Sequence, residues 1–210
     1  MTQTINLRTN VKEVTKGLSR LHRRQIPFAT SRALNRTGNL AFKGLRQKAR
    51  RTFDGGAAPG TITAFTPRNR GPNRNIIYST KEDLRTVLFL PDWAAKYLQY
   101  QIEGGVRRTK GAGTGVPTRN KSLNEFGNIK GRKAGLVKGK KQFVATKQGI
   151  HGVWEKYGRK GSSVRLLIAF EKNPRYTKKF KYYETITTMA RVHLDLQLKK
   201  SLKDAIRDAR

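Results

Sequence analysis

The sequence predicts an α+β fold in which an antiparallel sheet is flanked by two N-terminal helices and a long C-terminal helix. Helical periodicity at both ends of the chain predicts the helices, and short runs of β-branched and aromatic residues between them predict the strands. A basic, glycine-rich stretch over 104–141 predicts a long loop. At 210 residues we expect a single domain over 1–210 with this loop inserted as an arm.

The composition is strongly basic. Lys and Arg total 46 against 13 Asp and Glu, which gives a formal net charge of +33. This excess is typical of proteins that bind nucleic acid, with a membrane surface as the lesser option. The chain has neither an apolar run of transmembrane length nor a signal-peptide pattern, so we expect no membrane partner and use in a cytoplasm. It has no cysteine, which excludes disulfides and thiolate metal sites.

Two helices are predicted near the N-terminus, over 11–24 and 27–53. The first has four apolar residues on one side, and Pro27 suits the first turn of the second. Gly38 and Gly44 each weaken an isolated helix by about 1 kcal/mol relative to alanine. We therefore expect the apolar side of the second helix to pack closely against another backbone.

The opposite side of this second helix is basic. Polar residues step along it by threes and fours with no acid between them: Arg32, Arg36, Asn39, Lys43, Arg46 and Arg50. Neighbouring like charges repel one another unless a polyanion is near. A solvated surface explains the pattern equally well. We call these residues the basic row.

The middle of the chain predicts a sheet and a helix. β-Branched and aromatic residues predict short strands over 61–66, 75–79 and 84–90. A short helix is expected over 92–103. The arm over 104–141 follows, with nine glycines, eleven Lys or Arg and one acid. It cannot bury enough apolar surface to fold alone, so we expect an extended arm that is ordered by its neighbours or by nucleic acid.

The last third predicts three more strands and a final helix. The strands are expected over 142–146, 149–157 and 164–170, and the last of them is apolar enough to lie at the centre of a sheet. The helix is expected from about residue 182 to the end, with an apolar stripe along one side.

No pattern of residues predicts catalysis. The three histidines lie far apart, and the glycines of 111–116 lack the spacing of a dinucleotide fingerprint. There is no nucleophile elbow, no phosphate-binding loop and no evident pair of carboxylates. We therefore expect no enzyme, no cofactor and no metal site.

One block of residues resembles a known family. Ile26-Pro27 leads into a helix with small residues and an Ala-x-Asn-Arg core, Ala33 to Arg36. This block is similar to the minor tail protein Z family of lambda-like tailed bacteriophages, the tail completion or head-tail joining proteins. Residues 97–105 and 152–158 resemble passages of the same family, and the final helix matches its C-terminal arm in placement.

The resemblance implies a structural protein of the virion. Such proteins form a ring, usually sixfold, at the head-proximal end of the tail, and the genome passes through it. A homo-oligomer that contacts other neck and tail proteins and holds DNA without reading its sequence is therefore expected. The resemblance assigns no role to the arm.

Two sets of site residues follow from these patterns. The candidates for nucleic-acid binding are cations of the arm and, as second choice, three of the basic row: Arg107, Arg108, Lys110, Arg119, Lys121, Lys130, Arg132, Lys133, Lys138, Lys140, Lys141, Arg36, Lys43 and Arg50. The candidates for a subunit interface lie on the helices: Leu34, Ala41, Leu45, Tyr97, Leu194, Leu198 and Leu202.

The alternative hypothesis is a cytoplasmic nucleic-acid-binding protein of ribosomal type. Its basic, glycine-rich arms would have the same composition. The chain has no recognisable RNP or KH element, and its long terminal helices favour contacts between subunits. A nuclease would need clustered acids, which the sequence lacks.

Overall fold

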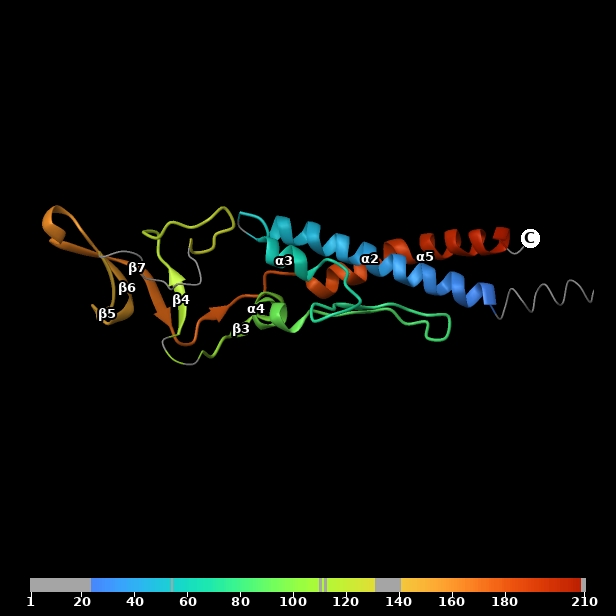
Figure 1. The fold of residues 1–210 in the computed structure, drawn as a ribbon, viewed down its shortest axis with the longest axis horizontal. Coiled ribbons are helices and arrows are strands. Elements are labelled where there is room, and N and C mark those ends of the chain that lie inside the picture. The colour runs from blue at the N-terminus through green and yellow to red at the C-terminus, as the bar shows by residue number, and fades with distance from the viewer. Residues whose placement is uncertain (1–23, 54, 110, 112, 131–140, 209–210) are drawn as a thin grey trace, which may run out of the picture. The chain divides into compact units, whose positions relative to one another are not determined.

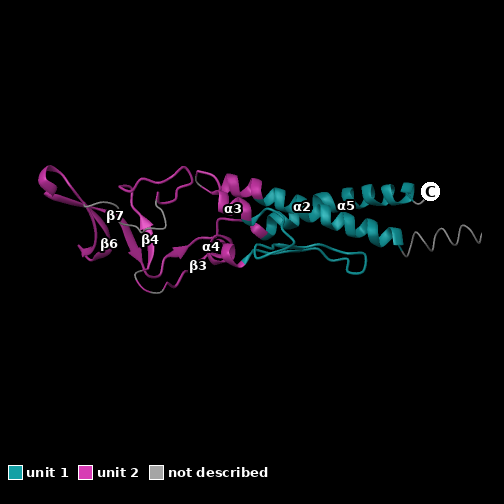
Figure 2. Cartoon of the chain, in the orientation of Figure 1, with its two compact units in different colours: residues 1–45, 64–91, 183–210 teal, residues 46–63, 92–182 magenta. Residues whose placement is uncertain are grey.

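The computed structural model describes residues 24–53, 55–109, 111, 113–130 and 141–208, and its architecture is α+β. The chain divides into two compact units, which are coloured separately in Figure 2. Unit 1 comprises residues 1–45, 64–91 and 183–210, and unit 2 comprises residues 46–63 and 92–182. This division does not test the expectation of a single domain, which stays a prediction. The predicted helix over 11–24 lies outside the described residues, apart from Arg24.

The second predicted helix is confirmed as α2 (Ile26–Thr52). Pro27 stands in its first turn, where a proline has no helical hydrogen bond to lose. In unit 1 its apolar side is fully inside the protein, because Ala29, Ala33, Phe42 and Leu45 are at most 1% exposed. Burial of this side, more than the helix propensity of the residues, stabilises α2.

The predicted C-terminal helix is confirmed as α5 (Tyr182–Asp208). Figure 1 shows it beside α2, and the two helices run in opposite directions. Their contact is close at Gly44, where an added Cβ would lie 2.7 Å from Met189 Cγ. At Gly38 an added Cβ would lie 3.0 Å from Thr86 Cγ2. Both glycines make room for side chains, so the expectation that they pack against a backbone is wrong.

A short antiparallel ribbon accounts for two of the predicted strands. β1 (Ile76–Ile77) pairs with β2 (Val87–Leu88), with Ile76 opposite Leu88. These strands are much shorter than the stretches predicted over 75–79 and 84–90. The side chain of Asn35 on α2 holds the ribbon, because its Oδ1 accepts hydrogen bonds from Ser79 N at 2.8 Å and from Thr86 Oγ1 at 2.7 Å.

The strand predicted over 61–66 is wrong, because these residues begin in a helix, α3 (Pro59–Ala64). Pro59 occupies the first position of α3, where its fixed φ favours a helix. The Thr63 hydroxyl donates a hydrogen bond back to the Pro59 carbonyl at 2.9 Å. Ala64 and Phe65 are completely buried. Tertiary packing and the proline thus outweigh the β propensity of the threonines and isoleucine.

In unit 2 the predicted short helix is confirmed as α4 (Asp92–Glu103), which buries Ala94, Leu98 and Ile102. Asp92 in its first turn complements the helix dipole. Next along the chain, β3 (Gly105–Val106) pairs antiparallel with β8 (Arg175–Tyr176). Backbone hydrogen bonds tie the residues after β8 to α4, since Lys179 N and Phe180 N both donate to the Gln101 carbonyl.

A four-stranded antiparallel sheet forms the rest of unit 2. Its strands are arranged in the order β4-β7-β6-β5. Their bounds are β4 (Thr114–Pro117), β5 (Gln142–Lys147), β6 (Ile150–Tyr157) and β7 (Ser163–Glu171), with the short helix η2 (Arg159–Gly161) between β6 and β7. The three predicted late strands and the central place of β7 are confirmed. Val153, Leu167 and Ile168 form the core on this sheet, with Ile129 and Phe170 packed against them.

Strands β3 and β4 lie within the stretch that the sequence predicts to be an arm without secondary structure, so they are a correction to it. Both are held by partners far along the chain, β3 by β8 and β4 by β7. Thr118, just after β4, also donates its hydroxyl hydrogen to the Leu166 carbonyl at 2.7 Å. Residues 131–140 of the arm lie outside the described part of the chain.

Candidate nucleic-acid interface

The basic row on α2 is only partly available to a ligand. Lys43 and Arg50 are exposed, as are Arg32 and Arg51. Arg36 is half-buried, and its Nη1 atom is buried without a hydrogen-bond partner among the described residues. A phosphate can therefore reach Lys43 and Arg50 more readily than Arg36.

Asn35 of the Ala-x-Asn-Arg core has a structural task in this protein. Besides its two accepted hydrogen bonds, its Nδ2 donates to the Ser79 carbonyl at 2.9 Å. Ser31 Oγ, one turn earlier on α2, donates to the same carbonyl at 2.8 Å. These bonds attach the β1–β2 ribbon to α2 within unit 1. The side chain of Asn35 is thus engaged inside the protein and has little capacity left for DNA.

The predicted cations of the arm fall into two groups. Five lie outside the described residues: Lys110, Arg132, Lys133, Lys138 and Lys140. The other six are placed. Four of them are exposed, namely Arg108, Arg119, Lys130 and Lys141. The other two, Arg107 and Lys121, are half-buried.

The placed cations are attached to the two strand systems of unit 2. Arg107 follows β3, and its backbone N–H donates to the Pro174 carbonyl beside β8 at 3.0 Å. Lys141 precedes β5 and its carbonyl accepts a hydrogen bond from Lys156 N at 2.9 Å. Arg119 follows Thr118, which β7 holds. Arg107, Arg119 and Lys141 thus stand in segments next to paired strands.

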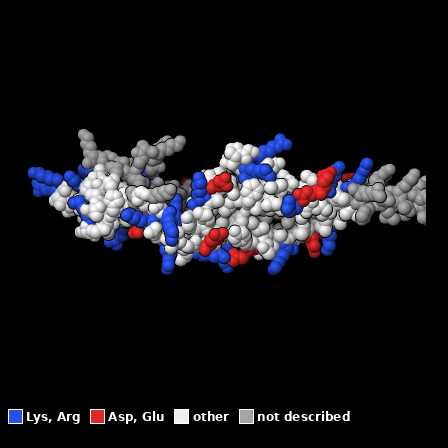
Figure 3. Space-filling view, turned by 90° about the horizontal axis from the view of Figure 1, so that it is seen from below, with Lys and Arg blue, Asp and Glu red and all other residues white. Residues whose placement is uncertain are grey.

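Sequence reasoning missed the cations of the late strands. Exposed lysines and arginines stand on β5, β6, β7, β8 and the turn of η2: Lys147, Lys156, Arg159, Lys160, Arg165 and Arg175. On the face shown in Figure 3, mostly Lys and Arg project from the part of unit 2 that carries β5, β6 and β7. Basic residues at strand ends and in a Gly-Arg-Lys-Gly turn were the available signal.

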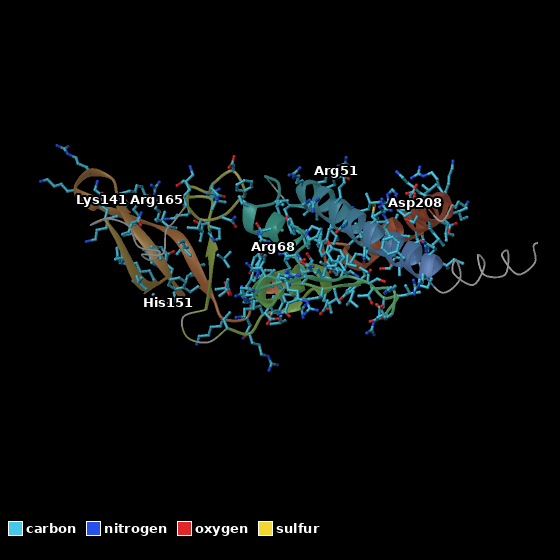
Figure 4. The ribbon with its side chains drawn as sticks, turned by 45° about the vertical axis from the view of Figure 1, so that its right-hand side comes forward. Arg51, Arg68, Lys141, His151, Arg165 and Asp208 are labelled. Atoms are coloured by element: carbon cyan, nitrogen blue, oxygen red, sulfur yellow. The ribbon has the colours of Figure 1, made fainter. Side chains whose placement is uncertain are left out.

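Lys141, η2 and Arg165 belong to one end of the four-stranded sheet. Figure 4 shows Lys141 and Arg165 at that end and His151 at the other. The register agrees, because Gln142 is opposite Glu155, which is opposite Arg165. We call Lys141, Arg159 and Lys160 the sheet-end cluster.

Arg165 differs from these three because it has an acidic partner. Its Nε and Nη2 atoms donate to Glu155 Oε2 at 2.8 and 2.6 Å. Gln142 Nε2 donates to Glu155 Oε1 at 3.1 Å. The hydrogen bond from Gln142 and then the one from Arg165 lower the pKa of Glu155, so this carboxylate stays ionised at neutral pH. Arg165 is therefore a weaker candidate for a phosphate contact.

Two of the seven predicted subunit-interface residues are buried within the chain, and the other five are half-buried. Ala41 is 2% exposed and Leu45 is fully buried, which leaves no side-chain surface there for a second subunit. Leu34 is half-buried on α2, and Tyr97 is half-buried at the wall of a cavity in unit 2. The three predicted leucines of α5 are also half-buried: Leu194, Leu198 and Leu202.

Two exposed apolar residues of α5, Val192 and Leu196, were missed. Val192, Leu196 and Ile206 are exposed by 54, 60 and 50%. At 3.6 residues per turn they fall within an arc of about 80°, which the exposed Lys199 and Lys203 share. Met189, which contacts Gly44, and the buried Ala205 lie outside this arc. We call these three residues the outer face of α5. Their spacing was visible in the sequence, but a helix that is apolar on two sides does not reveal which side is packed.

Across residues 24–208, leaving out the undescribed positions, no three His, Asp or Glu side chains gather as a metal-binding group would. None of the helices described is both long and apolar enough to cross a bilayer.

Comparisons of the chain with protein-family models, with curated proteins and with solved structures find no match.

Proposed function

We propose that the protein is a structural component of a tailed-bacteriophage virion, a tail completion or head-tail connector protein. In this role it assembles with copies of itself into a ring and contacts the genome without reading its sequence. Three kinds of observation support the proposal: the charge of the chain, the exposed apolar face of α5, and the resemblance of the α2 block to the minor tail protein Z family.

The excess of cations is the observation that carries the nucleic-acid part of the proposal. If every one of the 13 acids neutralised one cation, 33 of the 46 would still need counter-ions. In the described structure Lys81, Arg85, Arg165 and Arg207 have an acid within ion-pair distance. A polyanion is the partner that best neutralises such an excess of cations, and the phosphates along DNA form a polyanion.

The placement of the cations favours contact without base readout. Exposed Lys and Arg occur on α2, on the strands of unit 2 and in the η2 turn. Sequence-specific proteins place a helix or ribbon with a few defined side chains in the major groove. Scattered cations instead follow phosphates, which carry no sequence information directly. A passage for a genome needs this second kind of contact.

The outer face of α5 supports self-assembly. Apolar patches at the surface of a protein commonly mark an interface. Val192 and Leu196 are one helical turn apart and both more than half exposed. A ring buries this kind of surface between successive subunits.

The oligomeric state tests the proposal. We expect the nuclease-treated protein to be a closed oligomer by size-exclusion chromatography with light scattering, and to show rings in negative stain. Val192→Glu with Leu196→Glu is expected to shift it to smaller species, because two carboxylates cannot be buried there without partners. Tyr183→Glu with Thr187→Glu is the matched control, since both residues are exposed one turn apart on the same helix but outside the arc of the outer face.

The opposite results would count against the ring. A wild-type protein that is monomeric at all concentrations tested, or an RNA-dependent monomer, contradicts it and favours the ribosomal-type alternative. If the variant with Val192→Glu and Leu196→Glu remains oligomeric, the outer face of α5 is not part of the interface.

A further inference from the structure

Unit 2 contains a cavity to whose wall five aromatic residues contribute. Its volume is about 270 Å³, and rings from four separate segments contribute to its wall: Phe53, Tyr97, Tyr100, Phe126 and Tyr176. Arg107 lines it as well. We call this cavity the aromatic pocket. Its volume is near the lower limit of small-ligand sites, roughly 300 Å³, so it suits one ring system better than a large cofactor.

Two of the tyrosine rings and the guanidinium group of Arg107 lie against one another. The centroids of Tyr100 on α4 and Tyr176 on β8 are 5.5 Å apart, with an angle of 32° between the rings. The guanidinium carbon of Arg107 is 5.9 Å from the Tyr100 centroid. Aromatic and guanidinium planes of this kind are the groups on which unpaired bases stack.

A few polar groups also line the aromatic pocket. The side-chain amides of Gln101 and Asn128 belong to lining residues and can donate or accept a hydrogen bond. Burial raises the pKa of Tyr97, and a hydrogen bond with Thr61 partly offsets this effect. The Tyr97 hydroxyl is therefore protonated at neutral pH. An apolar cavity with a small number of polar groups has the character of a ligand site.

The strands beside the aromatic pocket carry the charge that a phosphate chain needs. Val106 pairs with Arg175, next to the Gly105–Tyr176 pair. Arg108 and Arg175 are exposed there, as is Lys179. Two acids, Glu103 and Glu171, are exposed near the ends of α4 and β7. The β3–β8 ribbon is thus basic on balance and continuous with the ring-lined wall.

We propose that the aromatic pocket takes one unpaired base of a single-stranded nucleic acid, whose neighbouring phosphates lie along the β3–β8 ribbon. The inference rests on the proposed function in that it assumes a nucleic-acid partner, and it adds a site for an unpaired end or gap. If only the rings are considered, the aromatic side chain of a partner protein would fit the pocket as well. The cations beside them favour a base that is joined to phosphates.

The test separates the base from the phosphates. Two fluorescently labelled strands of 12 abasic deoxyribose phosphates are compared by anisotropy, one of them with a single thymine at its centre. We expect the thymine to tighten binding by about 5- to 150-fold, the range that stacking of one base contributes. Equal affinity of the two strands would overturn the aromatic pocket as a base site, and an aromatic side chain of a protein would then be its better occupant.

Variants locate the effect. Tyr100→Leu and Tyr176→Leu are each expected to remove most of the thymine-dependent gain. Tyr157→Leu is the matched control, because Arg165 lies over the Tyr157 ring at 5.5 Å but neither residue lines the aromatic pocket. A gain that survives both pocket variants, in proteins with the circular dichroism of the wild type, would overturn the assignment. The comparison of the two strands needs no variant, so it holds even where a variant fails to fold.

Binding to duplex DNA distinguishes this inference from the proposed function. A paired base is not available to the aromatic pocket, so the Tyr100 and Tyr176 variants should bind duplex like the wild type. Duplex binding without a thymine-dependent gain would overturn the base site and leave the proposed function standing. A thymine-dependent gain in a protein that does not bind duplex would support the base site and contradict the proposed function.

Discussion

At the scale of single residues, the side chains of two asparagines hold segments of unit 1 together by hydrogen bonds. Asn35 joins α2 to the β1–β2 ribbon through Ser79 and Thr86. Asn75 is completely buried, and its Nδ2 donates to the carbonyls of Ala64 and Thr66 at 2.9 and 2.8 Å. Its Oδ1 accepts from Arg68 N at 2.7 Å. Each polar atom of the Asn75 side chain is thus matched to a backbone group.

Asn75→Ala should destabilise the protein by about 2–4 kcal/mol, because it leaves two carbonyls and one N–H without their side-chain partner. Thermal and urea unfolding measure the change. Asn69→Ala is the control, since Asn69 is exposed a few residues earlier in the same loop. A loss below about 0.5 kcal/mol for Asn75→Ala, or an equal loss for both variants, would show that the hydrogen bonds of Asn75 do not hold this loop.

At the scale of elements, close packing of α2 against α5 organises unit 1. Small residues on α2 allow the approach, and Gly44 is the point where Met189 fills the space that a larger residue would occupy. Alanines at 29, 33 and 41 are buried on the same helix. The two helices therefore need each other, because neither would keep its apolar side covered alone.

Gly44→Leu should cost about 1–3 kcal/mol of unfolding free energy, since the added side chain overlaps Met189. The penalty exceeds the gain of roughly 0.8 kcal/mol or more that a leucine brings to helix propensity. Gln47→Leu, at an exposed position of α2, should change stability by less than about 0.5 kcal/mol.

A double-mutant cycle identifies the partner of Gly44. Adding Met189→Ala to Gly44→Leu should recover part of the loss, with a coupling energy of about 0.5–3 kcal/mol. Strict additivity of the two substitutions would mean that Met189 is not what limits the space at Gly44.

The elements that the sequence predicts well are those with a sustained period. α2 and α4 are amphipathic over several turns, and the apolar run of β7 correctly predicts a central strand. Prediction fails where the deciding contacts are distant. β3 and β4 contain glycine, have no apolar period, and owe their pairing to β8 and β7.

The same distinction applies to the candidate site. The exposed places of Lys43 and Arg50 follow from helical spacing, which the sequence contains. The partial burial of Arg36 depends on neighbours from other elements, and the sequence does not reveal these neighbours. The aromatic pocket joins Tyr100 to Tyr176, 76 positions later in the numbering. The β3–β8 pairing and the hydrogen bonds from Lys179 and Phe180 to Gln101 bring them together. No local pattern predicts such a site.

At the scale of the whole molecule, charge is the dominant property. The net charge of +33 makes the chain repel itself in dilute salt and attract any polyanion. The sheet-end cluster is a compact part of that charge, because Lys141, Arg159 and Lys160 are exposed around one end of the four-stranded sheet. Exposed cations of this kind act on phosphates through counter-ion release, so their effect is read in the salt dependence of binding.

Matched charge variants separate free cations from those with acidic partners. Lys141→Gln, Arg159→Gln and Lys160→Gln together should reduce the slope of log affinity against log salt on duplex DNA by about two to three. The control combines Lys81→Gln, Arg85→Gln and Arg207→Gln, which removes the same charge from residues that have acids within ion-pair distance. The control should change the slope by less.

The most direct test of the account is the affinity of the wild-type protein for two duplexes of equal length and unrelated sequence, measured across a range of salt concentrations. The account predicts equal affinities and a steep common slope, with about 0.9 for each phosphate contacted. A slope near zero would contradict contact through phosphates. A difference in affinity of more than about 10-fold between the two sequences, equivalent to about 1.4 kcal/mol, would contradict binding without base readout.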